Sequence, residues 1–190
     1  MKISGNLWFV VLVTTLITIP GCNDSQQTAS DAKRAGQMKY SIIDLDSFTA
    51  MGTLTRLTTA EESGEKYTEI WKNFELYNDR LKSLSTDRMY YGVCFATKQK
   101  DVFDYLAGMA VRNDAVPPDK NLVIRNVPAV RYAVFQCPVQ DIGRTYQYIL
   151  NQWLPKSRYV LNTTACSFEQ YPPQGKEDVS VLIHIPVSNK

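Results

Sequence analysis

Two stretches of the chain repeat apolar residues at three- and four-residue steps, which predicts two amphipathic helices. The first stripe consists of Tyr67, Ile70, Trp71, Phe74, Tyr77 and Leu81. Thr59 and Glu62 precede it at the spacing of a capping box. The second stripe consists of Ile142, Tyr146, Ile149, Leu150, Trp153 and Leu154, with Asp141 as the expected cap and Pro155 as the expected end.

Stretches rich in β-branched and aromatic residues predict the strands. Residues 89–97 and 102–111 follow the first helix, and residues 165–171 and 179–187 follow the second, with a Pro-Pro-Gln-Gly turn at 172–175. An extended stretch precedes each helix, at 40–58 with an interruption at Gly52, and at 122–135. The order strand, helix, strand, strand therefore occurs twice. We expect an α+β fold of duplicated βαββ halves, whose antiparallel sheets lie side by side and form a cleft where they meet.

The N-terminus has a different pattern. Lys2 is followed by an apolar run at residues 7–19 that is short for a membrane span. The string Ile19-Pro20-Gly21-Cys22 resembles a bacterial lipoprotein processing site, which implies cleavage before Cys22 and a lipid on that cysteine. The alternative is an ordinary secretory signal with an incidental cysteine.

This interpretation divides the chain into three parts. Residues 1–21 form the signal peptide, residues 22–38 a polar, aperiodic tether, and residues 39–190 one domain. We expect a lipoprotein anchored on the periplasmic or other extracytoplasmic face of a bacterial membrane. Sequence alone leaves inner and outer membrane open, and it also leaves the oligomeric state open.

Charge and cysteine content narrow the function classes. The formal net charge is +2, and it falls to +1 once Lys2 is removed, so no basic surface points to nucleic acid. With Cys22 lipidated, Cys94, Cys137 and Cys166 remain, which allows one disulfide and a thiol, or three thiols.

Metal and cofactor chemistry find few ligands in the sequence. His184 is the single histidine, and no two cysteines stand at metal-ligand spacing. Strand alternation separates His184 from Val181, Ile183 and Ile185, so we expect a surface or edge histidine. We expect neither a metal nor a cofactor.

Glu169 is the main candidate for binding chemistry because it stands among aromatic residues in the string Ser-Phe-Glu-Gln-Tyr. Alternation places Glu169 and Tyr171 on one face of their strand, and Phe168 and Gln170 on the other. A carboxylate walled by aromatic rings suits an apolar organic cation, since the rings add dispersion and cation–π attraction. The alternatives are that Glu169 faces solvent or pairs with Arg131 or Arg144.

Aromatic residues of both halves could wall the same cleft. Trp71 and Phe74 lie on the inner face of the first helix, where packing in the core is, for each residue taken alone, the simpler role. Tyr91, Tyr105 and Tyr132 lie on the strands, and several converging phenols favour a partly wet cavity, because each buried hydroxyl needs a partner.

Seven short passages resemble, in order and spacing, the GyrI-like effector-binding domain. They contain Trp71, Tyr91, Tyr105, Pro128 to Phe135, Trp153-Leu154-Pro155, Phe168 to Tyr171, and Ile183 to Val187. That domain is the ligand-sensing half of MerR- and AraC-type multidrug regulators, and a distantly related haem-binding group (SOUL-like) shares its fold. The resemblance implies a hydrophobic cleft between the halves, with Glu169 as counter-ion to lipophilic cations and Trp71, Tyr91, Tyr105 and Phe135 as its walls. It also departs from the regulators, because the chain shows no DNA-binding segment.

Three functions remain open at this point. The first is a membrane-tethered module that binds amphipathic or cationic small molecules. The second is a hydrolase of electrophilic small molecules in which Glu169 acts as general base. The third is an interaction module that holds another macromolecule.

Overall fold

The computed structural model describes residues 38–173 and 180–190. The predicted signal peptide, Cys22, nearly all of the tether, and part of the predicted turn at 172–175 lie outside the described residues. Within the described part, no helix is both long and apolar enough to cross a membrane.

The predicted repeat is confirmed. The first half contains β2 (Phe48–Thr58), α2 (Gly64–Glu75), the short α3 (Asn78–Lys82), β3 (Ser85–Ala96) and β4 (Val102–Val111). The second contains β6 (Val130–Pro138), α4 (Ile142–Tyr148), β8 (Ser167–Tyr171) and β9 (Ser180–Asn189). A 3₁₀ turn (Val139–Asp141), a π-helical segment (Ile149–Trp153), α5 (Leu154–Lys156) and β7 (Tyr159–Leu161) complete the second half.

The two halves share one antiparallel sheet, whereas we expected two sheets side by side. Its order is β1-β6-β9-β8-β3-β4-β2-β5, with β7 paired to β9. The seam between the halves is the β3–β8 pair, in which Gly92 lies opposite Glu169. Residues from both repeats therefore meet at the centre of the sheet.

The strand that precedes each half in the chain pairs with a strand of the other half. β1 (Tyr40–Leu45) precedes β2 in the chain but pairs with β6, and β5 (Val123–Val127) precedes β6 but pairs with β2. The predicted interruption at Gly52 is therefore misplaced, since the chain passes between β1 and β2 from one edge strand to the next-to-last strand on the other side of the sheet. Gly52 lies inside β2 opposite Gly108, where a Cβ would be 2.0 Å from the carbonyl oxygen of Ala107. Only glycine allows this close approach.

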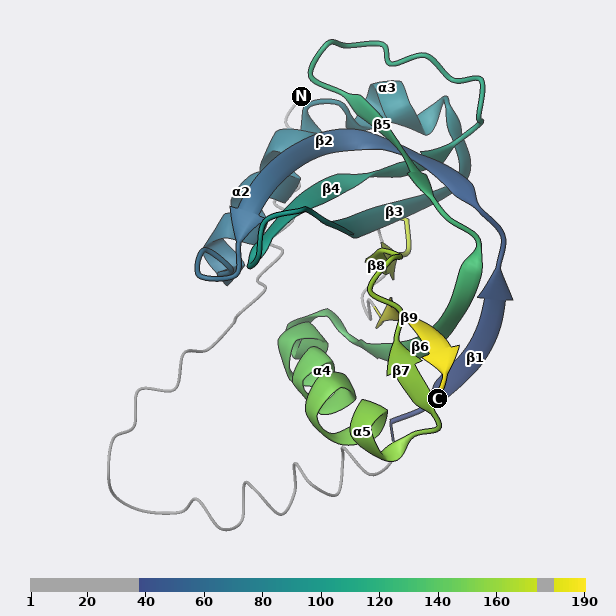
Figure 1. The fold of residues 1–190 in the computed structure, drawn as a ribbon. Helices are drawn as coiled ribbons and strands as arrows, with labels where there is room; N and C mark the ends of the chain where they lie inside the picture. Colours follow the sequence, from purple (N-terminus) through teal and green to yellow (C-terminus); the bar gives the residue numbers. More distant parts are fainter. Residues whose placement is uncertain (1–37, 174–179) are drawn as a thin grey trace, which may run out of the picture.

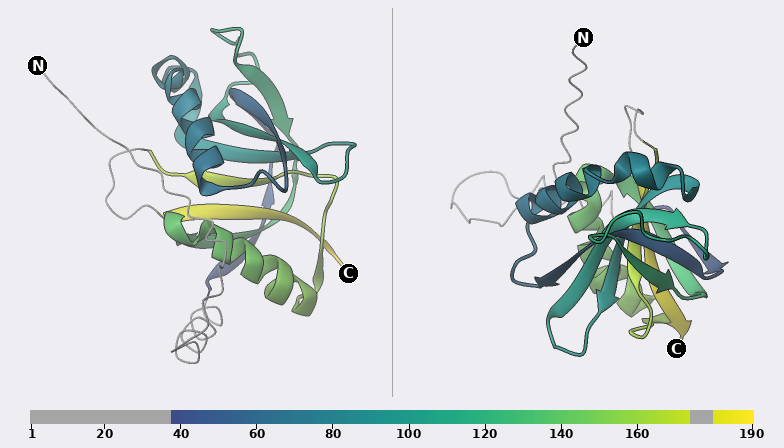
Figure 2. Two further views of the ribbon diagram at one scale, coloured as in Figure 1. Left: turned by 90° about the vertical axis from the view of Figure 1, so that its left-hand side faces the viewer. Right: turned by 90° about the horizontal axis from the view of Figure 1, so that it is seen from above.

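Helices α2 and α4 lie on the same side of the curved sheet (Figures 1 and 2). The described residues form two separate apolar cores. One lies between the helices and the sheet and includes Ile70, Phe74 and Trp153. The other lies on the opposite face of the sheet and includes Tyr91, Tyr132 and Phe168.

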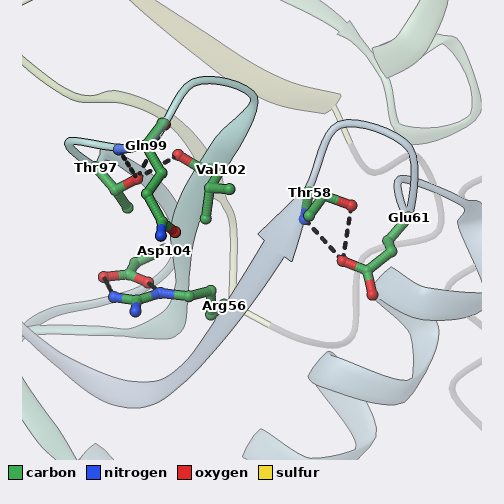
Figure 3. Close-up of polar contacts among 7 residues, drawn as sticks. All are labelled: Arg56, Thr58, Glu61, Thr97, Gln99, Val102 and Asp104. Carbon is green, nitrogen blue, oxygen red and sulfur yellow. Dashed lines mark hydrogen bonds and ion pairs between the residues drawn. The ribbon is translucent and has the colours of Figure 1, made fainter.

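The loop between β2 and α2 is fixed by polar contacts (Figure 3). Glu61 accepts hydrogen bonds from the backbone N–H of Thr58 at 2.8 Å and from its hydroxyl at 2.9 Å. The N-cap of α2 is Ser63, whose hydroxyl accepts from the backbone N–H of Lys66 at 3.2 Å. The predicted cap at Thr59 is thus displaced by one turn, because Thr59 is still bound to the strand through its N–H to the carbonyl of Asp101.

Candidate functional site

A cavity of about 400 Å³ lies where α2, α4 and the central strands meet. This is large enough for a drug-sized ligand. Its described lining residues are Thr59, Glu62, Tyr67, Trp71, Cys94, Phe103, Tyr105, Ile142, Gly143, Tyr146, Gln147, Leu150, Ser167, Glu169 and Tyr171. Both repeats contribute, so the cavity depends on their association.

Glu169 is buried at the wall of this cavity, with 6 % of its surface exposed. The Tyr146 hydroxyl donates to its Oε1 at 2.5 Å, and the Tyr105 hydroxyl donates more weakly to Oε2 at 3.4 Å. Tyr146 comes from α4 and Tyr105 from β4. Two neutral phenols from different halves therefore hold the carboxylate.

Burial raises the pKa of Glu169 to about 7, and the hydrogen bonds from Tyr146 and Tyr105 partly offset that rise. The described lining contains no lysine, arginine or histidine. Arg131 makes a bidentate pair with Asp44 at 2.9 Å, and Arg144 lies 3.7 Å from Asp141. The described residues thus give Glu169 no cationic side chain in the cavity, and neither arginine alternative is met.

Aromatic rings form much of the rest of the wall. Trp71 and Tyr171 pack edge to face with their ring centroids 5.3 Å apart, and Tyr67 and Tyr105 do so at 5.0 Å. Burial raises the pKa of Tyr105, Tyr146 and Tyr171 well above the usual phenol value, so these hydroxyls stay neutral. The wall offers π-faces and phenol hydroxyls.

The structure brings together four of the eight residues expected at the site: Glu169, Trp71, Tyr105 and Tyr171. Phe74 and Phe135 belong to the core beneath the helices, where Phe74 packs against Tyr90 and Phe135 against Trp153. Tyr91 and Tyr132 lie on the opposite face of the sheet. The position of Tyr91 follows from the alternation of side chains along β3. Its neighbour Gly92 lies opposite Glu169 on the cavity face, so Tyr91 points to the other face.

Sequence reasoning missed Tyr67, Tyr146 and Glu62 as site residues. Tyr67 and Trp71 are four residues apart on α2, so they share one helix face, and Tyr146 was on the apolar stripe of the second helix. The signal was present, but the stripe did not tell which of its residues pack in the core and which line the cavity.

Gly92 leaves the space in which the carboxylate meets the phenol. A Cβ at this position would lie 2.0 Å from the Tyr105 hydroxyl oxygen and 2.6 Å from Oε2 of Glu169. Any side chain there would displace one of the two groups. The glycine is therefore part of the site although it carries no chemistry.

His184 and the three described cysteines belong to no metal site among the described residues. The prediction that His184 is a surface or edge residue is wrong: it is 4 % exposed and stacks on Phe168 with ring centroids 4.1 Å apart. Cys94, Cys137 and Cys166 are all free, which settles the disulfide question for these three. Among the described residues, no group of histidine, cysteine and acidic side chains could hold a metal ion.

Solved structures share the fold. The chain aligns with SAV2435 bound to tetraphenylphosphonium at a TM-score of 0.64 and 17 % identity, covering 80 % of this chain and 94 % of that one. It aligns with the C-terminal domain of EcmrR at 0.60 and 15 %, covering 81 % and 99 %. An integron cassette protein from the mobile metagenome of Vibrio cholerae aligns at 0.57 and 21 %, covering 80 % and 97 %.

The family assignment comes from the sequence. No curated protein matches the chain at a significant level. A family model does match, over residues 41–187, which is almost the whole described domain. The expected resemblance to effector-binding domains is confirmed, and the chain belongs to the family described as integron-associated effector binding protein, Cass2.

Proposed function

We propose that this protein binds lipophilic organic cations in the cavity, with Glu169 as the counter-ion. The observation that carries the proposal is a buried carboxylate that accepts hydrogen bonds from two phenols, in a cavity whose described lining contains no cationic residue. A bound cation would supply the missing positive charge, and the rings of Trp71 and Tyr171 would contact its apolar groups. The structural relative SAV2435 bound to tetraphenylphosphonium supports this choice of ligand class.

Calorimetric titration with tetraphenylphosphonium tests the proposal, with triphenylphosphine oxide as a neutral ligand of similar shape. We expect Glu169→Gln to weaken binding of the cation at least tenfold, because the buried positive charge of the ligand loses its counter-ion. A tenfold change in Kd corresponds to about 1.4 kcal/mol. The neutral ligand should be affected little. Equal binding of both ligands by both proteins would refute the role of Glu169.

The affinity for the cation should depend on pH. Since the pKa of Glu169 is about 7, the carboxylate is largely protonated at pH 5.5 and largely ionised at pH 8.5. Cation binding should therefore be up to about 30-fold weaker at pH 5.5, which is 1.5 pH units below that pKa. Glu169→Gln should show no such dependence.

The membrane tether is part of the same proposal. It rests on the apolar run at residues 7–19 and on Cys22. Fractionation of cells that express the full chain should place it with the membranes. Cys22→Ser should abolish labelling by an alkyne-tagged palmitate, and persistence of the label would contradict lipidation at Cys22.

A hydrolase remains the second candidate, because a carboxylate with a pKa of about 7 is suited to general base catalysis. In this reaction Glu169 would take a proton from the attacking water and pass it to the oxygen released from the electrophile. Turnover of an epoxide or activated ester that Glu169→Gln abolishes, while ligand binding survives, would favour the enzyme over the binding protein.

A further inference from the structure

The cavity has a second carboxylate at a different position in the chain. Glu62 lies in the loop between β2 and α2 and lines the cavity together with Glu169. Glu62 is exposed, whereas Glu169 is buried. The two carboxylates therefore stand at the open and the closed side of one cavity.

Glu62 is held in place from both directions. The Tyr67 hydroxyl donates to its Oε1 at 2.8 Å, which leaves Oε2 available for another donor. The preceding residue, Glu61, is fixed to Thr58 (Figure 3). The N–H of Thr59 donates to the carbonyl of Asp101 at 2.9 Å. The loop thus presents Glu62 to the cavity in a defined position, which reduces the entropy lost on binding.

Aromatic rings bridge the space between the two carboxylates. The ring of Tyr67, whose hydroxyl is bound to Glu62, packs on the ring of Tyr105, whose hydroxyl is bound to Glu169. The two carboxylates repel each other electrostatically, since the negative charge of Glu62 contributes to the raised pKa of Glu169. Such a pair repels itself until positive charge lies near both ends.

We propose, on the basis of the proposed function, that the preferred ligands are dications whose two positive groups are separated by an apolar linker, with one group on Glu169 and the other on Glu62. The first group is bound in the buried part of the cavity, and the second is bound at its mouth beside the Tyr67 hydroxyl. A ligand with a single charge fills the same cavity but leaves Glu62 without a partner.

Decamethonium and decyltrimethylammonium test this proposal, because they share a ten-carbon chain and differ in the second ammonium group. The titrations are run at pH 8.5, where Glu169 is largely ionised. We expect wild-type protein to bind decamethonium about fivefold more tightly, which is the value of one well-positioned exposed ion pair. Glu62→Gln should remove this preference, because it should weaken decamethonium binding more than decyltrimethylammonium binding.

Glu65→Gln is the matched control, since Glu65 is an exposed carboxylate in the first turn of α2 that does not line the cavity. It should keep the preference for decamethonium, whereas Glu169→Gln should weaken both ligands. A preference no larger than the statistical advantage of a symmetrical ligand, or one that survives Glu62→Gln, would overturn the proposal. If decyltrimethylammonium still binds in a Glu169-dependent manner, the proposed function stands; if neither ligand binds, both fail.

Discussion

At the scale of single residues, Gly92 decides whether the site can exist. Gly92→Ala would place a methyl group 2.0 Å from the Tyr105 hydroxyl oxygen and 2.6 Å from Oε2 of Glu169. We expect the free energy of unfolding to fall by about 1–3 kcal/mol through overpacking. Binding of tetraphenylphosphonium should weaken at least tenfold, because the carboxylate must move. Urea denaturation and calorimetry measure the two effects.

Tyr105→Phe provides the control for that prediction. It removes the oxygen that the new methyl group would meet first, so Gly92→Ala should cost less stability in the Tyr105→Phe background than in the wild type. A cost that is the same in both backgrounds would show that Gly92 is required for another reason.

Glu169 should make the protein less stable as the pH rises. Its pKa is about 7 in the folded state, against the ordinary 4.5. Between these values the folded state binds a proton that the unfolded state has lost, so the free energy of unfolding falls with rising pH, by about 3 kcal/mol in total. Relative to wild type, Glu169→Gln should therefore be more stable at pH 8 than at pH 4. Urea denaturation at both pH values measures this, and a constant difference between the two proteins would contradict the buried carboxylate.

At the scale of elements, two different residues near the start of α2 have the two roles: Ser63 caps the helix, and Thr59 lines the cavity. Ser63→Ala should lower the free energy of unfolding by about 1 kcal/mol, because the N–H of Lys66 loses its acceptor. Thr59→Ala is the matched comparison: Thr59 was expected to cap the helix but lies outside it. Thermal unfolding of both variants should show the larger loss for Ser63→Ala, and the opposite order would restore the cap at Thr59.

The elements were more predictable than their partners. The bounds of β4 and the faces of β8 follow from local periodicity, so Glu169 and Tyr171 were placed correctly on one face. The pairing of Gly92 with Glu169 depends on which strands meet across the two halves. Nothing local encodes that register, and for this reason Tyr91 was assigned to the cavity although it faces the other core.

The second helix shows a different limit of sequence reasoning. Its apolar stripe predicts one continuous helix, but the structure has a π-helical segment at Ile149–Trp153 between α4 and α5. Packing of Trp153 against Phe135 and Tyr159 is a tertiary demand that the stripe does not reveal. The insertion shifts the faces of the following turn, so a stripe drawn at a constant 3.6-residue period cannot assign every residue beyond it.

At the scale of the whole molecule, the sheet separates a hollow face from a packed face. Glu169 and its phenols line the cavity on the helix side, while His184 stacks on Phe168 and packs edge to face with Tyr132 on the other side. Both groups are buried, yet they change stability in opposite directions as the pH rises. The reason is that the carboxyl group of Glu169 is neutral when protonated, whereas the imidazole of His184 is neutral when deprotonated.

Burial lowers the pKa of His184 to about 4, from the ordinary 6.5. Between these values the unfolded chain binds a proton that the folded protein does not, so stability rises with pH, by about 3 kcal/mol in total. Over pH 4.5–6.5 this rise opposes the fall caused by Glu169. We therefore expect the two contributions to cancel in the wild type. His184→Phe keeps a ring stacked on Phe168, and its free energy of unfolding should fall as the pH rises from 4.5 to 6.5. The free energy of unfolding of Glu169→Gln should rise over the same range. Urea denaturation at pH 4.5, 5.5 and 6.5 measures both slopes, and slopes of the same sign would refute burial of one of the two groups.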